Sequence, residues 1–165
     1  MPKRSESMAY TRVEYVHSKP PPRVTRFTLG DTRLNYDYRV DMVAPHSIEL
    51  SGKSLEAARI TANKVLGIEE GQQFLLKVVT YPHEITRAQR FMGFAGADRL
   101  SQGMRRSFGK ANERAAEIRA GQKILSVYCM ESGIENAKIA LTRASKKLPI
   151  PCRIEVEELK KTEPA

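Results

Sequence analysis

YDYRVDM, at residues 36–42, is the stretch that first indicates the fold class. Aromatic or aliphatic side chains occupy every second position, and Asp or Arg stands between them. Because successive side chains of a strand point to opposite faces of a sheet, this period of two predicts a half-buried β-strand. The globular part of the chain therefore begins here.

Further strands and two helices are predicted beyond this stretch. Short apolar runs predict strands at residues 47–50, 74–79, 115–119, 124–130 and 152–156. Helical spacing of apolar residues predicts one helix at 54–66, capped by Ser54 and followed by Gly67, and another at 134–148. Strands and helices are mixed without a regular βαβ alternation, which favours an α+β fold with a mixed sheet and two helices.

The regions outside this pattern suggest a division of the chain. Residues 1–35 are predicted to be a basic extended arm, because three consecutive prolines at 20–22 favour an extended backbone and Lys and Arg outnumber Glu around them. Residues 36–158 are predicted to form a single α+β domain with a long loop at 80–112, which carries almost no hydrophobic periodicity. Residues 159–165 are predicted to be a charged tail.

The composition excludes several classes of protein. With 165 residues, 41% of them hydrophobic, the chain can bury a core without disulfide bonds or a metal. No run approaches the roughly 20 apolar residues of a membrane helix, and the basic start lacks the apolar stretch of a secretory signal. Cys129 and Cys152 form no CxxC pair, so we expect reduced thiols in a cytosolic protein, with no metal and no cofactor.

The positive charge points to a nucleic acid. The chain carries a net charge of +9, and between residues 85 and 110 six Lys or Arg residues stand against Asp98 alone. The same segment contains four glycines and three phenylalanines. Arginine binds phosphate oxygens, glycine lets backbone N–H groups approach phosphates, and phenylalanine stacks on unpaired bases. A solvated surface loop is the alternative, but the combination favours RNA or DNA as the partner.

Motifs for catalysis or nucleotide binding are incomplete. The run from Gly103 to Gly109 has five residues between its glycines where a P-loop has four, and Ala111 replaces the hydroxyl residue. GxxG at residues 93–96 lacks the flanking helices of a KH domain. His83-Glu84 lacks the second histidine of HExxH, and all three histidines are expected to be surface or core residues. We therefore expect no catalytic residues and no enzyme.

Four segments carry a family resemblance. They are SLEAARITANK at residues 54–64, YPHEITR at 81–87, AGADRLSQGMR at 95–105 continuing to FGK at 108–110, and KLP at 147–149. Together they resemble the universal L-sixteen family of large-subunit ribosomal proteins, in its archaeal and eukaryotic L-ten-e form. The resemblance covers about residues 8–158, and the brief tail is similar to the archaeal type.

This resemblance implies an α/β-hammerhead-like sandwich that binds large-subunit ribosomal RNA beside the elbow of aminoacyl-site tRNA. The glycine-rich loop would be directed towards the peptidyl transferase centre, and neighbouring ribosomal proteins would be further partners, with no membrane. A structural role in translation and late subunit assembly follows. With the charge map, RNA contacts are expected from Lys3, Arg4, Arg12, Arg23, Arg26, Arg87, Arg90, Arg99, Arg105, Arg106 and Lys110, and loop shape from Gly93, Gly96, Gly103 and Gly109.

Two alternatives and one further surface remain. A ribosome assembly or translation factor would bind the same RNA only transiently. An RNA-modifying enzyme would need a cofactor pocket or a positioned acid–base pair, and the sequence indicates neither. The outer face of helix 134–148 is either a solvated face or a second phosphate-contacting surface, through Lys138, Arg143, Lys146 and Lys147.

Overall fold

The computed structural model describes residues 16–67, 73–88 and 109–159, which contain eight strands and two α-helices. The strands are β1 (Thr28–Gly30), β2 (Tyr38–Val43), β3 (Ile48–Ser51), β4 (Phe74–Val78), β5 (Glu84–Ala88), β6 (Lys110–Ile118), β7 (Lys123–Cys129) and β8 (Arg153–Glu158). The helices are α1 (Gly52–Leu66) and α2 (Ile134–Ser145), and a 3₁₀ turn at Glu131–Gly133 precedes α2. Neither described helix is long and apolar enough to cross a membrane.

The strands form two sheets. The larger has five strands in the order β1-β4-β7-β2-β8, and the smaller has three in the order β3-β6-β5. All of these neighbours pair antiparallel, where the sequence analysis expected a mixed sheet. A tight turn at residues 119–122 leads from β6 into β7 and so connects the two sheets. The α+β class predicted from the sequence is confirmed.

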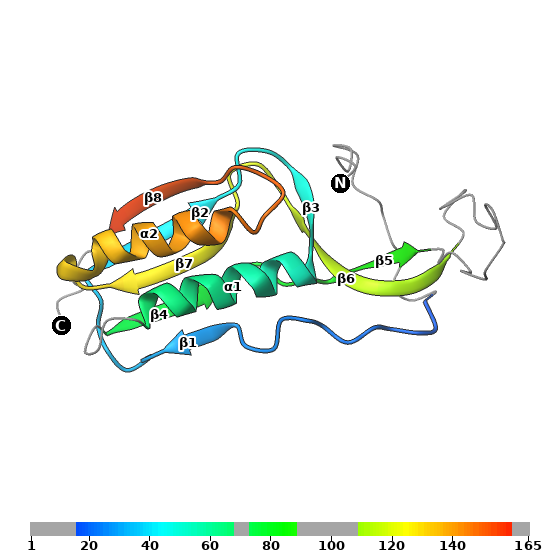
Figure 1. The fold of residues 1–165 in the computed structure, drawn as a ribbon, viewed down its shortest axis with the longest axis horizontal. Coiled ribbons are helices and arrows are strands. Elements are labelled where there is room, and N and C mark those ends of the chain that lie inside the picture. The colour runs from blue at the N-terminus through cyan, green and yellow to red at the C-terminus, as the bar shows by residue number, and fades with distance from the viewer. Residues whose placement is uncertain (1–15, 68–72, 89–108, 160–165) are drawn as a thin grey trace, which may run out of the picture.

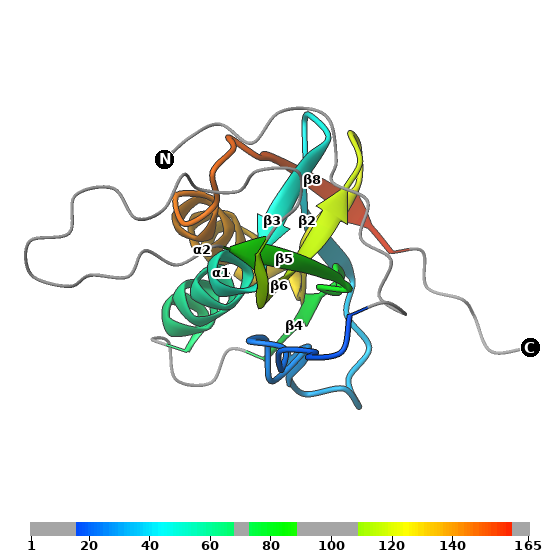
Figure 2. The same ribbon diagram turned by 90° about the vertical axis from the view of Figure 1, so that its right-hand side faces the viewer.

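Both helices cover one face of the five-stranded sheet and pack against each other (Figures 1 and 2). Helix α2 contacts β2, β7 and β8, and α1 contacts β3, β4 and β6. The largest fully buried side chains in this layer include Met42, Leu55, Leu76, Leu125 and Leu141. Burial of these apolar side chains is the main force that holds helices to sheet.

The strand predicted at residues 36–42 corresponds to β2, an interior strand of the five-stranded sheet. β2 lies between β7 and β8, and residues 40–43 are all buried, including Asp41 at 1% exposure. Val40 and Met42 face the core that α2 covers, whereas Asp41 lies on the opposite face against two cations. The predicted period of two is therefore confirmed, and the polar face is partly covered because Asp41 is buried beneath Arg39 and Lys123.

Helix α1 begins earlier than predicted. Its N-cap is Ser51, whose hydroxyl accepts a hydrogen bond from the Ser54 backbone N–H at 3.3 Å, so the prediction of Ser54 as the cap was wrong. Ser54 instead donates its own hydroxyl to the Ser51 carbonyl at 2.8 Å. Both serines are good caps, and the choice falls on Ser51 because β3 ends there. The predicted end at Gly67 is confirmed.

The long predicted loop is shorter in the structure. Residues 84–88 form β5 and residues 110–118 form β6, so the boundaries 80 and 112 were wrong. Charged or polar residues stand on both faces of β5 and at the start of β6, which hides the period of two from the sequence. Backbone pairing between the two strands supplies the structure that side-chain hydrophobicity does not indicate.

Part of the predicted arm belongs to the fold. Residues 28–30 form β1 at the edge of the five-stranded sheet, and Val16 and Val24 are buried. Gly30 has a positive φ of 104°, and a Cβ there would lie 2.0 Å from the Phe74 carbonyl oxygen. Only glycine allows this close approach. The expected end of the arm at residue 35 is therefore not a structural boundary, whereas residues 1–15 lie outside the described residues.

The last strand is also longer than predicted. β8 runs to Glu158, and its residues 153–158 pair with β2. Glu157, expected to belong to a solvated run of carboxylates, instead forms ion pairs with Arg39 and Lys123. The antiparallel register explains this, because Glu157 lies directly opposite Arg39 on β2.

Candidate nucleic-acid interface

The β5–β6 hairpin is the base of the glycine- and arginine-rich segment. Ala88 lies opposite Lys110, and Arg87 lies opposite Ala111, next to a register shift after Thr86. Lys110 is exposed and Arg87 is half-buried. Gly109 is also described, but Arg90, Arg99, Arg105, Arg106, Gly93, Gly96 and Gly103 lie outside the described residues, so their predicted roles stay predictions.

The second stretch of predicted site residues is the segment 16–27, which runs alongside β6 and then joins β4 through β1 (Figure 1). Val24 is buried to 1% exposure, while Arg23 and Arg26 on either side of it are exposed. The buried valine anchors the backbone and leaves the two guanidinium groups to solvent. Lys3, Arg4 and Arg12 lie outside the described residues.

Arg114 of β6 joins these two stretches. Its Nε donates a hydrogen bond to the Pro20 carbonyl oxygen at 2.8 Å, and its Nη1 donates to the Tyr81 hydroxyl at 3.3 Å. The Tyr81 ring lies 5.4 Å from the Phe27 ring, between ring centroids. Segment 16–27 and the hairpin therefore form one surface, which we call the basic region.

Carboxylates of the small sheet have local partners. The Glu113 carboxylate lies 3.1 Å from Lys53 Nζ, which comes from the first turn of α1. Glu84 lies 3.6 Å from the His83 imidazole. Arg23, Arg26 and Lys110 make no ion pair within the described residues. These three cations are thus available to an external anion.

The five-stranded sheet pairs its charges internally instead. Asp41 Oδ2 lies 3.0 Å from Arg39 Nε and 2.6 Å from Lys123 Nζ, and Glu157 contacts the same two cations. The hydrogen bond to Asp41 raises the pKa of Lys123 despite the cost of burial. Hydrogen bonds from Arg39 and Lys123 lower the pKa of Glu157. Both cations of this network, Arg39 and Lys123, are thus paired with carboxylates of the protein itself.

The other cations singled out in the sequence lie on α2 and just beyond it. Lys138, Arg143, Lys146 and Lys147 are all exposed, but α2 ends at Ser145, so the predicted helix end at residue 148 was wrong. The helix buries Ala137, Ala140, Leu141 and Ala144 on its opposite side. Exposure fits both a solvated face and a phosphate-contacting face.

One group of side chains has the composition of a metal site. His83, Glu84 and Glu117 place one ligand atom each within 4.8 Å of one another. His83 Nδ1 lies 3.1 Å from the Tyr81 carbonyl oxygen, and its half-exposed ring has its Nε2 near Glu84. Because the His83 ring is half-exposed and acidic groups of this kind are common without a bound ion, we assign the group no ligand.

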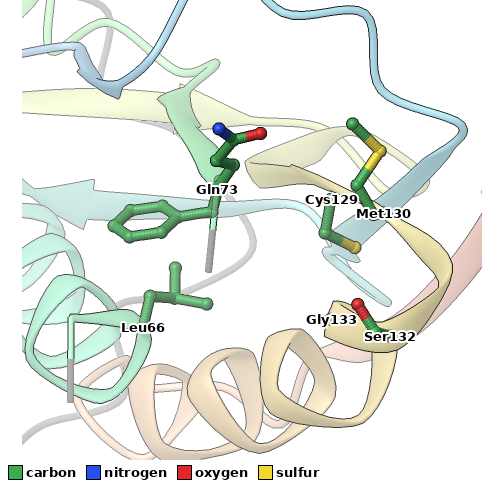
Figure 3. Close-up of a pocket in the computed structure, with 7 residues that line it drawn as sticks. Leu66, Gln73, Cys129, Met130, Ser132 and Gly133 are labelled. Carbon is green, nitrogen blue, oxygen red and sulfur yellow. The ribbon is translucent and has the colours of Figure 1, made fainter. Parts of the chain in front are cut away.

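A small hollow lies at the other end of the molecule, where α1 ends and α2 begins (Figure 3). None of the described residues that line it is charged, and burial raises the pKa of the Cys129 thiol among them. Burial also raises the pKa of Cys152 to about 11, which makes that thiol a poor nucleophile. The lining residues are Leu66, Gln73, Phe74, Cys129, Met130, Ser132 and Gly133.

Arg114 was missed by the sequence analysis. The signal was its register, because Arg114 alternates in phase with Ala116 and Ile118, which are fully buried. An arginine at an inward position of a strand needs partners within the protein. The predicted strand began at residue 115, one position after Arg114, so that phase was not recognised.

Comparisons with known proteins agree with the resemblance seen in the sequence. The family described as "Ribosomal protein L16p/L10e" matches residues 3–155. Large ribosomal subunit protein uL16 of Hyperthermus butylicus is 41% identical over 92% of this chain and 84% of its own length. The uL16 proteins of Staphylothermus marinus (42% identity, 92% of this chain, 87% of its own length) and Archaeoglobus fulgidus (41%, 90%, 86%) are similarly related. The chain belongs to the ribosomal protein L16p/L10e family.

Proposed function

We propose that the protein is a structural constituent of the large ribosomal subunit in the cytoplasm and binds large-subunit ribosomal RNA. The observation that carries the proposal is the separation of its charges. Arg23, Arg26 and Lys110 of the basic region are exposed and lack ion pairs within the described residues. Arg39 and Lys123 of the five-stranded sheet are paired internally. The names of the relatives, which are ribosomal proteins and not enzymes, support a structural role.

The chemistry of the interface is neutralisation of phosphates. Lysine and arginine side chains displace the counterions of the RNA backbone, and the protein reads the shape of the RNA more than its sequence. Segment 16–27 supplies the exposed cations Arg23 and Arg26, and the hairpin supplies Lys110 beside the glycine- and arginine-rich segment. No catalytic group is part of this proposal.

The family resemblance supports a finer placement within the same proposal. In that placement the glycine-rich loop predicted from the sequence is directed towards the peptidyl transferase centre, and the protein lies beside the elbow of aminoacyl-site tRNA. Its role is then to hold RNA helices and the tRNA-facing surface in shape, with neighbouring ribosomal proteins as further partners. The support is the AGADRLSQGMR run at residues 95–105 and its continuation to Lys110.

Binding to transcribed large-subunit ribosomal RNA at increasing salt tests the RNA contact. If roughly 6–10 phosphates are contacted, affinity should fall by about 10³–10⁵ between 50 and 200 mM salt. The variant Arg23→Gln, Arg26→Gln, Lys110→Gln should give a salt dependence shallower by about three phosphates. A matched triple, Lys64→Gln, Lys77→Gln, Arg153→Gln, removes equal charge from exposed positions on α1, β4 and β8. Equal losses in both triples would contradict the proposed interface.

Sedimentation with large subunits separates a constituent from a transient factor. A structural constituent should remain with large subunits after a high-salt wash, because many weak contacts and a folded surface hold it in place. An assembly or translation factor should be released by the same wash. Release of the protein would contradict the structural role, even if the RNA contact were confirmed.

A further inference from the structure

Arg114 uses its guanidinium group within the protein. It lies on β6 opposite Ile85, in phase with the buried Ala116 and Ile118, and its side chain is partly buried. Its Nε and Nη1 donate hydrogen bonds to the Pro20 carbonyl and the Tyr81 hydroxyl. A hydrogen bond from a charged donor is stronger than one between neutral groups. Arg114 is therefore committed to internal partners.

The two partners of Arg114 belong to the basic region. Pro20 begins the part of segment 16–27 that carries Arg23 and Arg26, and Phe27 at its other end contacts the Tyr81 ring at 5.4 Å. The Phe27 carbonyl also accepts a hydrogen bond from the Val78 backbone N–H at 2.7 Å. Residues 20–27 are thus held at both ends, and the two exposed arginines lie between the fixed points.

Fixing a backbone before binding has an energetic consequence. Each residue that must be ordered costs roughly 1–2 kcal/mol of conformational entropy. A segment already held in its bound conformation does not incur that cost when its partner arrives. The contacts at Pro20 and Phe27 therefore decide how much of the attraction between the two arginines and RNA appears as affinity.

We propose that Arg114 is a positioning residue for RNA binding. It acts through Arg23 and Arg26: by tying Pro20 and Tyr81 together, it holds the segment that presents these two side chains. It does not contact phosphate itself. This inference rests on the proposed function, since it assumes that the basic region binds ribosomal RNA.

A double-mutant cycle tests the coupling. Arg114→Gln is made in the natural background and in the background of Arg23→Gln with Arg26→Gln, and affinity for large-subunit ribosomal RNA is measured against salt. We expect Arg114→Gln to weaken binding about 5- to 10-fold in the natural background and to flatten the salt dependence. In the doubly substituted background it should have almost no effect. An equal loss in both backgrounds would show an independent contact and overturn the proposal.

Three controls keep the result specific. Arg119→Gln removes the same charge from an exposed arginine just beyond β6. Its effect on RNA affinity should be the same with and without Arg23→Gln and Arg26→Gln. Tyr81→Phe keeps the ring contact with Phe27 but removes the hydroxyl acceptor, and it should show a smaller loss with the same dependence on Arg23 and Arg26. Amide hydrogen exchange at Val78, whose N–H donates to the Phe27 carbonyl, should accelerate in Arg114→Gln. Unchanged exchange would contradict the positioning role.

The outcomes distinguish this inference from the proposed function. If Arg23→Gln with Arg26→Gln leaves RNA affinity and its salt dependence unchanged, the proposed interface fails, and the inference fails with it. If that double variant weakens binding but Arg114→Gln adds an independent loss, only the inference fails. If Arg114→Gln does not fold, Tyr81→Phe carries the same test, because it removes a hydroxyl and no charge.

Discussion

In the five-stranded sheet Arg39 lies directly opposite Glu157, whereas in the β5–β6 hairpin Lys110 lies opposite Ala88. Each region places a cation on a strand, but the register brings a carboxylate to Arg39 and a methyl group to Lys110. Facing residues of antiparallel strands are the nearest partners that a side chain has. The difference shows that strand pairing decides which cations form ion pairs within the protein and which stay available to bind a partner.

Segment 16–27 extends the same contrast. Its buried Val24 connects it to the core, and its exposed arginines make no ion pair within the described residues. Substitutions in the five-stranded sheet should therefore change stability, and substitutions in the basic region should change RNA affinity. Each of the following experiments can break or sharpen that division.

The largest loss of stability is expected from Met42→Ala in β2. Met42 is fully buried beneath the helices, and removal of its side chain leaves a cavity that costs roughly 2–5 kcal/mol. Urea unfolding measures the change. RNA affinity of the folded protein should stay the same, since Met42 is buried in the five-stranded sheet and is not part of the basic region. A variant that folds normally but loses RNA binding would contradict the division between the two regions.

Gly30→Ala should cause the next-largest loss of stability. A Cβ at Gly30 would lie 2.0 Å from the Phe74 carbonyl oxygen, so β1 must move away from β4, at a cost of roughly 1–3 kcal/mol. Gly121→Ala is the matched control, because Gly121 also has a positive φ but no atom within 4 Å of the added Cβ. It should cost about 1–2 kcal/mol from backbone conformation alone. Equal thermal shifts in the two variants would show that the close approach of β1 to β4 is unimportant.

Lys123→Met should have a smaller effect that depends on pH. The pKa of Lys123 is raised by its hydrogen bond to Asp41, so its contribution is present below the unfolded pKa and is lost as the pH rises through the folded value. The pair is partly exposed, and solvent screening limits the difference to about 1 kcal/mol or less at pH 7.

Urea unfolding from pH 7 to pH 11 checks this expectation. The difference in stability between the natural protein and Lys123→Met should narrow towards pH 11. The pKa of Glu157 is lowered, so its contribution is present above its unfolded pKa and is lost as the pH falls through the folded value. The two proteins should therefore also converge in strong acid. A difference that is constant across this range would mean that Lys123 acts through packing and not through its charge.

The smallest effect on folding is expected when Arg99, Arg105 and Arg106 are changed together to Gln. The sequence analysis assigns these residues to RNA, so the free energy of unfolding should change by no more than about 0.5 kcal/mol. Incorporation into large subunits, measured by sedimentation of cell extracts, should fall. Loss of the folded state in this variant would show that the three arginines form a structural cluster.

Much of the fold was predictable because its signals are local. The alternation at residues 36–42 and the helical spacing at 54–66 arise from side chains a few positions apart, and both predicted β2 and α1 within a few residues. β1 and β5 were missed because their three and five residues carry no apolar alternation and are stabilised by pairing with distant strands. Pairing between strands that are distant in sequence cannot be recognised from a few consecutive residues.

The sequence by itself determined the fold class, the positive charge and its concentration, and the family to which the chain belongs. These depend on residue types and their spacing along the chain. Only the tertiary structure decided that Arg39 pairs with Glu157, 118 residues away, and that Arg114 holds Pro20, 94 residues away. The physical reason is that ion pairs and hydrogen bonds depend on distances of a few ångströms in space, which strand register sets for Arg39 and Glu157 and the packing of segment 16–27 on β6 sets for Arg114 and Pro20.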